Sequence, residues 1–184
     1  MLLLERGELD AAREHLLANQ RLGEDAALPQ NPYRSRVAMA RVLQAEGDVD
    51  GALEQLDEAE RLYVGDFFPA VRPVPAVRAR IWISHGRTSD ALRWAREHGI
   101  SAEDELSYLH EFEHITLARA LLAQDRAEPS EDPAGHVVAM IDRLLRAAEE
   151  GGRTGPSSSF WRFWHLPTRK KRTTAGRWRR CDAR

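Results

Sequence analysis

Hydrophobic residues recur at helical spacing along most of the chain. In residues 49–63, apolar side chains fall three or four positions apart and so share one side of a helix: Val49, Ala52, Leu53, Leu56, Ala59, Leu62 and Tyr63. Residues 103–123 show the same spacing and predict a second long helix, with Ser101 and Asp104 as a capping pair at its start. The 26 Ala and 21 Leu, against 9 Val and 5 Ile, favour helices over strands. The sequence therefore predicts an all-α protein.

The helical pattern is periodic. A turn residue recurs every 39 or 40 positions: Gly7, Gly47, Gly86 and Asp125. Two sets of alanines keep the same interval: Ala12, Ala52 and Ala91 after the turns, and Ala40, Ala79 and Ala118 before them. Small residues let two antiparallel helices joined by a tight turn approach closely. Each repeat is thus predicted to be a helical hairpin, and such hairpins bury their apolar faces by stacking into an α-solenoid with a concave surface.

The repeat resembles the tetratricopeptide repeat, with matching small and apolar positions at Ala40, Gly47, Ala52, Leu56 and Ala59. Its interval exceeds the usual 34 residues, which longer loops between repeats would explain. Residues 91–97, 104–109 and 111–119 are more specifically similar to the repeat region of MalT-like, LuxR-class bacterial transcriptional activators. The resemblance covers residues 1–155 and implies a right-handed α-solenoid of about 3.5 repeats of 39–40 residues.

The resemblance also implies a role. Proteins of this family place an ATPase module before the repeats and a helix-turn-helix module after them, and the sequence contains neither pattern. The chain begins within the first helix of a repeat, so we expect a fragment of a larger regulator that senses an effector and contacts proteins through its groove. We expect no enzymatic activity and DNA contact only through the absent helix-turn-helix module. A stand-alone repeat adaptor that scaffolds partner proteins is the alternative.

Residues 110–114 match the His-Glu-x-x-His pattern of zinc peptidases. Two imidazoles four residues apart share a helix face and bind zinc, while the glutamate activates the metal-bound water, so His110, His114 and Glu111 form a weak candidate site. The longer metzincin pattern fails, because Leu117 stands where glycine is required. No third ligand is singled out. The favoured alternative is ordinary repeat sequence, with no metal and no cofactor.

An arginine follows each alanine that precedes a turn: Arg41, Arg80 and Arg119, again 39 residues apart. In the tetratricopeptide resemblance this position faces the inner groove, where guanidinium groups would bind carboxylates or phosphates in bidentate fashion. The alternative is that each arginine pairs with an acidic residue of the adjacent helix. The candidate groove, for a small-molecule effector or a protein partner, also includes three further side chains: Trp82, Tyr108 and His114. The aromatic residues would alternatively fill the solenoid core.

The last 28 residues differ sharply in charge from the rest. Residues 157–184 contain nine Lys or Arg and one Asp, whereas the whole chain has 27 basic and 29 acidic residues. Basic residues among aromatic ones suit nucleic acid or an anionic membrane surface, with Arg169, Lys170, Lys171 and Arg172 as weak nucleic-acid candidates. A third hypothesis, given the largest weight, makes residues 156–184 a basic, disordered frameshift product of a GC-rich gene. The sequence thus predicts a repeat domain over residues 1–155 and a tail over 156–184.

Two features bear on location. A single cysteine excludes an intrachain disulfide framework, which suits a reducing compartment. No apolar run approaches the roughly 20 residues that cross a bilayer. The sequence therefore predicts a cytoplasmic protein without a membrane partner.

Overall fold

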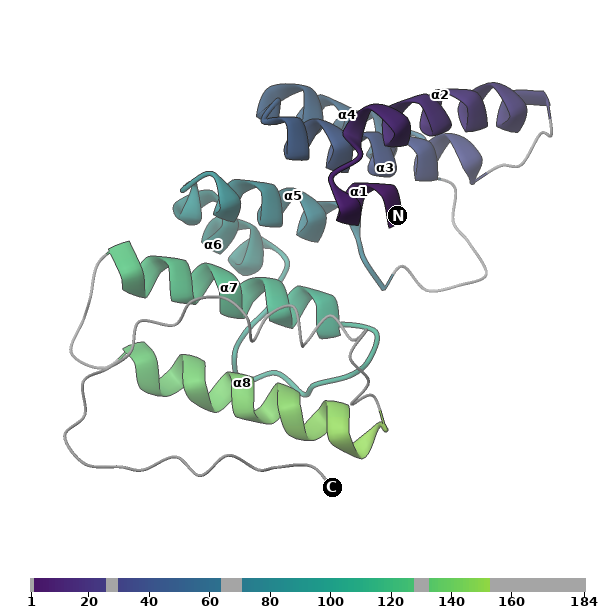
Figure 1. Ribbon diagram of the computed structural model, residues 1–184. Coiled ribbons are helices and arrows are strands. Elements are labelled where there is room, and N and C mark those ends of the chain that lie inside the picture. Colours follow the sequence, from purple (N-terminus) through teal and green to yellow (C-terminus); the bar gives the residue numbers. More distant parts are fainter. Residues whose placement is uncertain (1, 26–29, 64–70, 128–132, 153–184) are drawn as a thin grey trace.

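The structure is a computed structural model that describes residues 2–25, 30–63, 71–127 and 133–152. Within these residues the regular secondary structure is entirely helical, as predicted (Figure 1). The helices are α1 (Leu2–Arg6), α2 (Leu9–Asp25), α3 (Asn31–Glu46), α4 (Val49–Arg61), α5 (Val74–Ser84), α6 (Thr88–Glu97), α7 (Glu111–Ala127) and α8 (Pro133–Glu150).

The three glycines predicted to form turns each join the two helices of one hairpin. Gly7 lies between α1 and α2, Gly47 between α3 and α4, and Gly86 between α5 and α6, with φ angles of 78°, 90° and 75°. These left-handed conformations are costly for any residue with a Cβ atom, which explains glycine at this position of the repeat. The prediction of a fourth turn at Asp125 is wrong, because α7 continues through this residue to Ala127. No glycine is present there to end the helix.

The recurring alanines are fully buried. Ala40, Ala79 and Ala118 have no exposed surface, and neither have Ala52 and Ala91. Larger side chains at these positions would force the helices apart, since protein interiors are closely packed. Burial of these alanines agrees with the predicted reason for their period.

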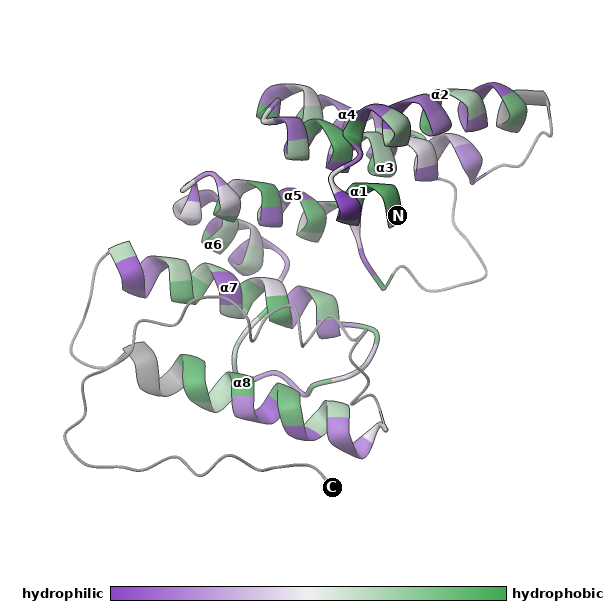
Figure 2. Ribbon diagram, viewed as in Figure 1, coloured by the Kyte–Doolittle hydropathy of each residue, from purple (hydrophilic) through white to green (hydrophobic). Residues whose placement is uncertain are grey.

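The core has two parts, which meet at α5. One is centred on α3 and α4, with Leu56 at its middle and Ile81 of α5 against it. The other joins α5 and α6 to α7 and α8, around Trp94, Ile115 and Met140. Hydrophobic and hydrophilic stretches alternate along the helices, as expected when one side of each is buried (Figure 2).

The hairpins stack in chain order (Figure 1). Each helix packs on the next one in the sequence, and α5 also packs on α7. This arrangement is that of a tetratricopeptide-like α-solenoid, as predicted. Its right-handed sense and its number of about 3.5 repeats stay predictions from the family resemblance.

The long helix predicted over 103–123 begins later than the hydrophobic spacing indicates. Ser101 N–H donates to Asp104 Oδ2 over 2.8 Å, so the predicted capping contact exists, but α7 begins only at Glu111. The Arg143 guanidinium of α8 donates to the carbonyl oxygens of Ala102 and Asp104. Because these carbonyls are bound by a side chain, a long-range contact holds the segment before α7 in a non-helical conformation.

The predicted tail, residues 156–184, lies outside the described residues, and so do its four nucleic-acid candidates and the boundary after residue 155. Among the helices that the structure describes, none combines the length and the apolar character needed to span a membrane.

Candidate functional site

The three predicted arginines lie on the first helices of successive hairpins, Arg41 on α3, Arg80 on α5 and Arg119 on α7. The pKa of Arg80 is lowered to about 9, first by burial and then by the positive charges of Arg119, Arg72 and Arg41, in that order of effect. Burial also lowers the pKa of Arg119. The structure therefore brings Arg41 and Arg119 within electrostatic reach of Arg80 and adds Arg72; we call these four residues the arginine cluster.

The guanidinium of Arg80 is held in a fixed orientation by α7. Its central carbon lies 3.6 Å from the centre of the Phe112 ring, and its Nε donates to Thr116 Oγ1 over 2.9 Å. The Thr116 hydroxyl donates in turn to the carbonyl oxygen of Phe112 over 2.7 Å, so its oxygen is oriented to accept from Arg80. The Arg72 guanidinium lies 5.8 Å from the centre of the same ring. One face and one edge of the Arg80 guanidinium are thus occupied, whereas its buried Nη2 has no hydrogen-bond partner in the part of the chain that the structure describes.

Another arginine of α5 pairs with carboxylates of the adjacent helix. Arg78, two positions before Arg80 on α5, contacts Asp57 at 2.5 Å and Glu60 at 2.8 Å. Arg80 forms no ion pair with a described residue, and the charges that act on its pKa are those of arginines. Two arginines of α5 thus differ in their ion pairs: two carboxylates neutralise Arg78, whereas no carboxylate of the described residues neutralises Arg80.

A mostly apolar pocket of about 280 Å³ borders Arg41. Leu3 and Leu4 of α1, Leu16 of α2 and Ala38 of α3 form part of its wall. Arg41 therefore adjoins both the positive charge of the cluster and a space suited to an apolar group.

The candidate aromatic residues divide between core and surface. Trp82 packs against the core of α5–α8, and its Nε1 is buried with no hydrogen-bond partner in the described part of the chain. The Arg87 guanidinium lies 5.6 Å from its ring centre. Tyr108 is 56% exposed in the segment before α7. Core packing therefore accounts for Trp82, while Tyr108 presents surface to solvent.

The His-Glu-x-x-His segment is arranged differently from a zinc site. His114 is buried, its Nδ1 donates to the His110 carbonyl oxygen over 2.9 Å, and its Nε2 lies 3.3 Å from Asp104 Oδ2. Both ring nitrogens thus face oxygen acceptors of the protein. His110 precedes α7, and its Nδ1 lies 2.7 Å from Glu113 Oε2. Within the described ranges no three His, Cys, Asp or Glu residues gather as a metal site, and this geometry favours the interpretation as ordinary repeat sequence.

Sequence reasoning missed Arg72, which lies outside the periodic pattern and just before Pro73, the residue preceding α5. It joins the cluster only through the three-dimensional packing of α5 against α7, so no local signal marks it.

Comparison with known proteins agrees with this architecture. Neither a curated protein nor a solved structure matches the chain. Residues 1–161 match the family described as the MalT-like TPR region, a helical-repeat family of the regulatory or interaction type. Because the match spans most of the chain and the described residues form stacked helical hairpins, the protein belongs to the MalT-like TPR region family.

Proposed function

We propose that the chain is the effector-sensing and protein-interaction repeat region of a LuxR-class transcriptional regulator, without enzymatic activity of its own, and that the arginine cluster binds its anionic effector or partner. The observation that carries this proposal is the state of Arg80. Its guanidinium is fixed over Phe112, is surrounded by like charges and forms no ion pair with a described residue. Family membership supports the regulatory role.

Carboxylate and phosphate are the groups that suit this cluster. A guanidinium presents its donors in a planar fork that matches both anions, and charge-assisted hydrogen bonds are among the stronger polar contacts in proteins. An anion would also offset the repulsion between Arg80 and its neighbouring arginines. Because Arg80 is largely removed from water, this attraction is screened less than at an exposed site.

The position of Arg80 connects binding to the arrangement of the repeats. Its side chain extends from α5 to Phe112 and Thr116 of α7, and these two helices belong to successive hairpins. An anion that reorients the guanidinium would change this contact. A regulator would respond only if the ligand binds one arrangement of the hairpins more tightly than another.

Anion binding is tested with inorganic pyrophosphate by isothermal titration calorimetry at constant ionic strength. We expect Arg80→Gln to weaken binding about tenfold, because one charge-assisted contact is lost. Arg93→Gln is the matched control, because Arg93 is exposed on α6 and pairs with Asp90. Equal affinities of the wild type and Arg80→Gln, or no binding to either, would contradict an anion site at the cluster.

The regulatory role is tested separately, on the gene. Coding sequence for an ATPase module upstream and for a helix-turn-helix module downstream would support a LuxR-class regulator. Flanking sequence without either module in any reading frame would instead favour the stand-alone adaptor.

A further inference from the structure

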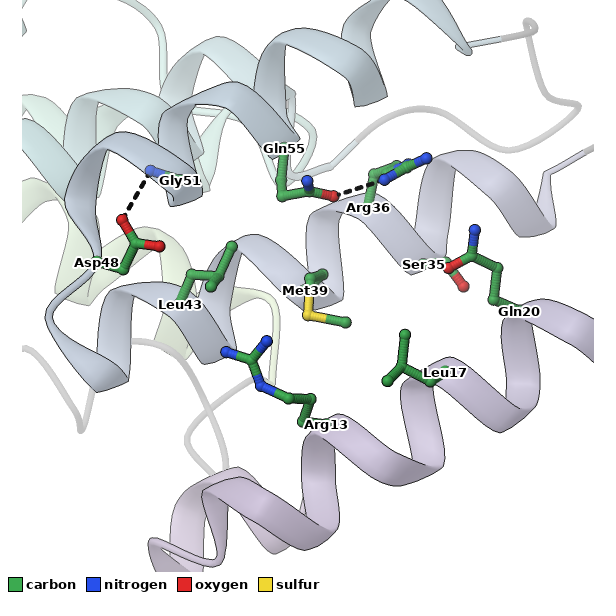
Figure 3. A pocket seen from close by; sticks show the side chains of 10 residues that line it. All are labelled: Arg13, Leu17, Gln20, Ser35, Arg36, Met39, Leu43, Asp48, Gly51 and Gln55. Carbon is green, nitrogen blue, oxygen red and sulfur yellow. Dashed lines mark hydrogen bonds between the residues drawn. The ribbon is translucent and has the colours of Figure 1, made fainter.

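A second pocket, of about 360 Å³, opens among α2, α3 and α4 (Figure 3). It lies on the other side of α3 from the arginine cluster, since Met39 lines it and a residue two positions further, such as Arg41, points about 200° around the helix. Its volume falls at the lower end of the range of about 300–1,000 Å³ that is typical of small-molecule sites.

Three polar side chains gather at one end of this pocket, from two different hairpins (Figure 3). Ser35 is only 7% exposed, and its hydroxyl has no hydrogen-bond partner among the described residues. The side chain of Gln20, on α2, points toward it in Figure 3. Arg36 donates from Nη1 to Gln55 Oε1 over 3.0 Å and forms no ion pair with any residue that the structure describes. This end therefore offers a cation and further hydrogen-bond donors.

The middle of the pocket is apolar. Leu17 of α2 projects between the helices toward Met39, and Leu43 follows one turn further along α3 (Figure 3). A hydrocarbon chain of a few carbons would bury its surface against these three side chains.

At the opposite end the charged groups have partners within the protein. Asp48 Oδ1 accepts from the Gly51 N–H over 2.9 Å and so caps α4. The Arg13 guanidinium is paired with the Glu46 carboxylate. Of the two pocket arginines, Arg36 is thus the one without an ion pair among the described residues.

We propose that this pocket binds a small organic carboxylate with an apolar chain. The carboxylate accepts from the Arg36 guanidinium, the Ser35 hydroxyl and the Gln20 amide, and the chain lies over Leu17 and Met39. A single uncompensated cation beside an apolar wall suits a monoanion. The site is separate from the arginine cluster and does not depend on the function proposed above.

Methionine methyl resonances provide a direct test in the full chain. The protein has three methionines, Met1, Met39 and Met140, of which Met39 lines the pocket and Met140, on α8, is 1% exposed in the core. With [ε-¹³C]methionine label, and with Met39→Leu for assignment, sodium hexanoate is expected to shift the Met39 signal saturably and leave Met140 unmoved. Hexanamide, which has the same length without the charge, is expected to bind at least about tenfold more weakly.

Two variants locate the carboxylate. Arg36→Gln is expected to weaken hexanoate binding about tenfold, whereas Arg61→Gln, at an exposed arginine of α4 outside the pocket, leaves it unchanged. Ser35→Ala is expected to weaken binding several-fold while leaving the melting temperature equal or higher, because it removes a buried hydroxyl without a partner. Because affinity falls while the melting temperature does not, Ser35→Ala still tests the proposal if Arg36→Gln fails to fold. The proposal is overturned if Met39 shows no saturable shift up to about 20 mM hexanoate, if hexanamide binds equally, or if Ser35→Ala leaves affinity unchanged.

Discussion

Replacing Arg80 by methionine separates the charge of this residue from its packing. Methionine is of similar length, is uncharged and lies well against an aromatic ring, so it can occupy the space over Phe112. The variant removes the guanidinium, its contact with Phe112 and its hydrogen bond to Thr116.

The expected change in the free energy of unfolding follows from three contributions. Lowering the pKa of Arg80 from 12.5 to about 9 corresponds to an unfavourable free energy on the order of 5 kcal/mol for holding the charge in the folded state. The cation–π contact with Phe112 offsets about 2 kcal/mol of this, and the charged hydrogen bond to Thr116 a further ~2 kcal/mol. We therefore expect Arg80→Met to raise the free energy of unfolding by about 1 kcal/mol at pH 7.5.

Urea denaturation measures this change without adding ions. Arg61→Met is the matched control, because the Arg61 side chain is 72% exposed and pairs with Glu58 of the same helix. Its free energy of unfolding should stay within about 0.5 kcal/mol of the wild type. A decrease of more than about 1 kcal/mol in Arg80→Met would refute the reasoning, since it would mean that the folded protein supplies Arg80 with a counter-ion.

The pH dependence gives a second, independent readout of the same charge. Below about pH 9 Arg80 is protonated in both the folded and the unfolded states, so its unfavourable contribution is constant. Above that pH the folded state loses the proton while the unfolded state, with its higher pKa, retains it. The free energy of unfolding of the wild type, relative to Arg80→Met, should therefore rise between about pH 9 and pH 10.5. A flat or falling difference contradicts the lowered pKa.

Three further variants test the fold. Gly47→Ala should cost about 1 kcal/mol of unfolding free energy by urea denaturation, because the φ angle of 90° strains alanine although no atom within 4 Å obstructs its Cβ. Asp48→Ala should cost a similar ~1 kcal/mol in the same assay, since the Gly51 N–H loses its capping acceptor. Arg143→Ala should accelerate amide hydrogen exchange in residues 101–110, with protection in α3 and α4 unchanged, because the variant frees the carbonyls of Ala102 and Asp104.

The repeat architecture was predictable because its requirements are local. A left-handed backbone after the first helix of a hairpin favours glycine, and a close helix crossing favours alanine, so both leave a mark at fixed positions of each repeat. Gly47, Ala52 and Ala79 satisfy these requirements as predicted. The turn predicted at Asp125 was wrong because this residue falls at the repeat interval but is not a glycine. Only glycine readily adopts the left-handed conformation found at the other turns.

Features that depend on contacts between distant elements were not predictable. The start of α7 at Glu111 reflects the contact of Arg143 with the preceding segment, some 40 positions away in the sequence. The polar end of the α2–α4 pocket combines Gln20 with Ser35 and Arg36, which belong to different hairpins and follow no repeat. The hydrophobic pattern assigns residues to one face of a helix, but it does not indicate which helix that face packs against.

In the arginine cluster, the buried alanines of the repeat also determine where the positive charges lie. Ala79 has no exposed surface, and the next residue on a helix points about 100° further around it. Arg80 is thereby directed along the boundary between α5 and α7, where it reaches Phe112 and loses much of its water. The same alanine and arginine succession recurs at Ala40 and Ala118. The repeat interval that stacks the hairpins therefore also sets the spacing of the cations, and Arg41 and Arg119, far from Arg80 in the sequence, act on its charge in the folded chain.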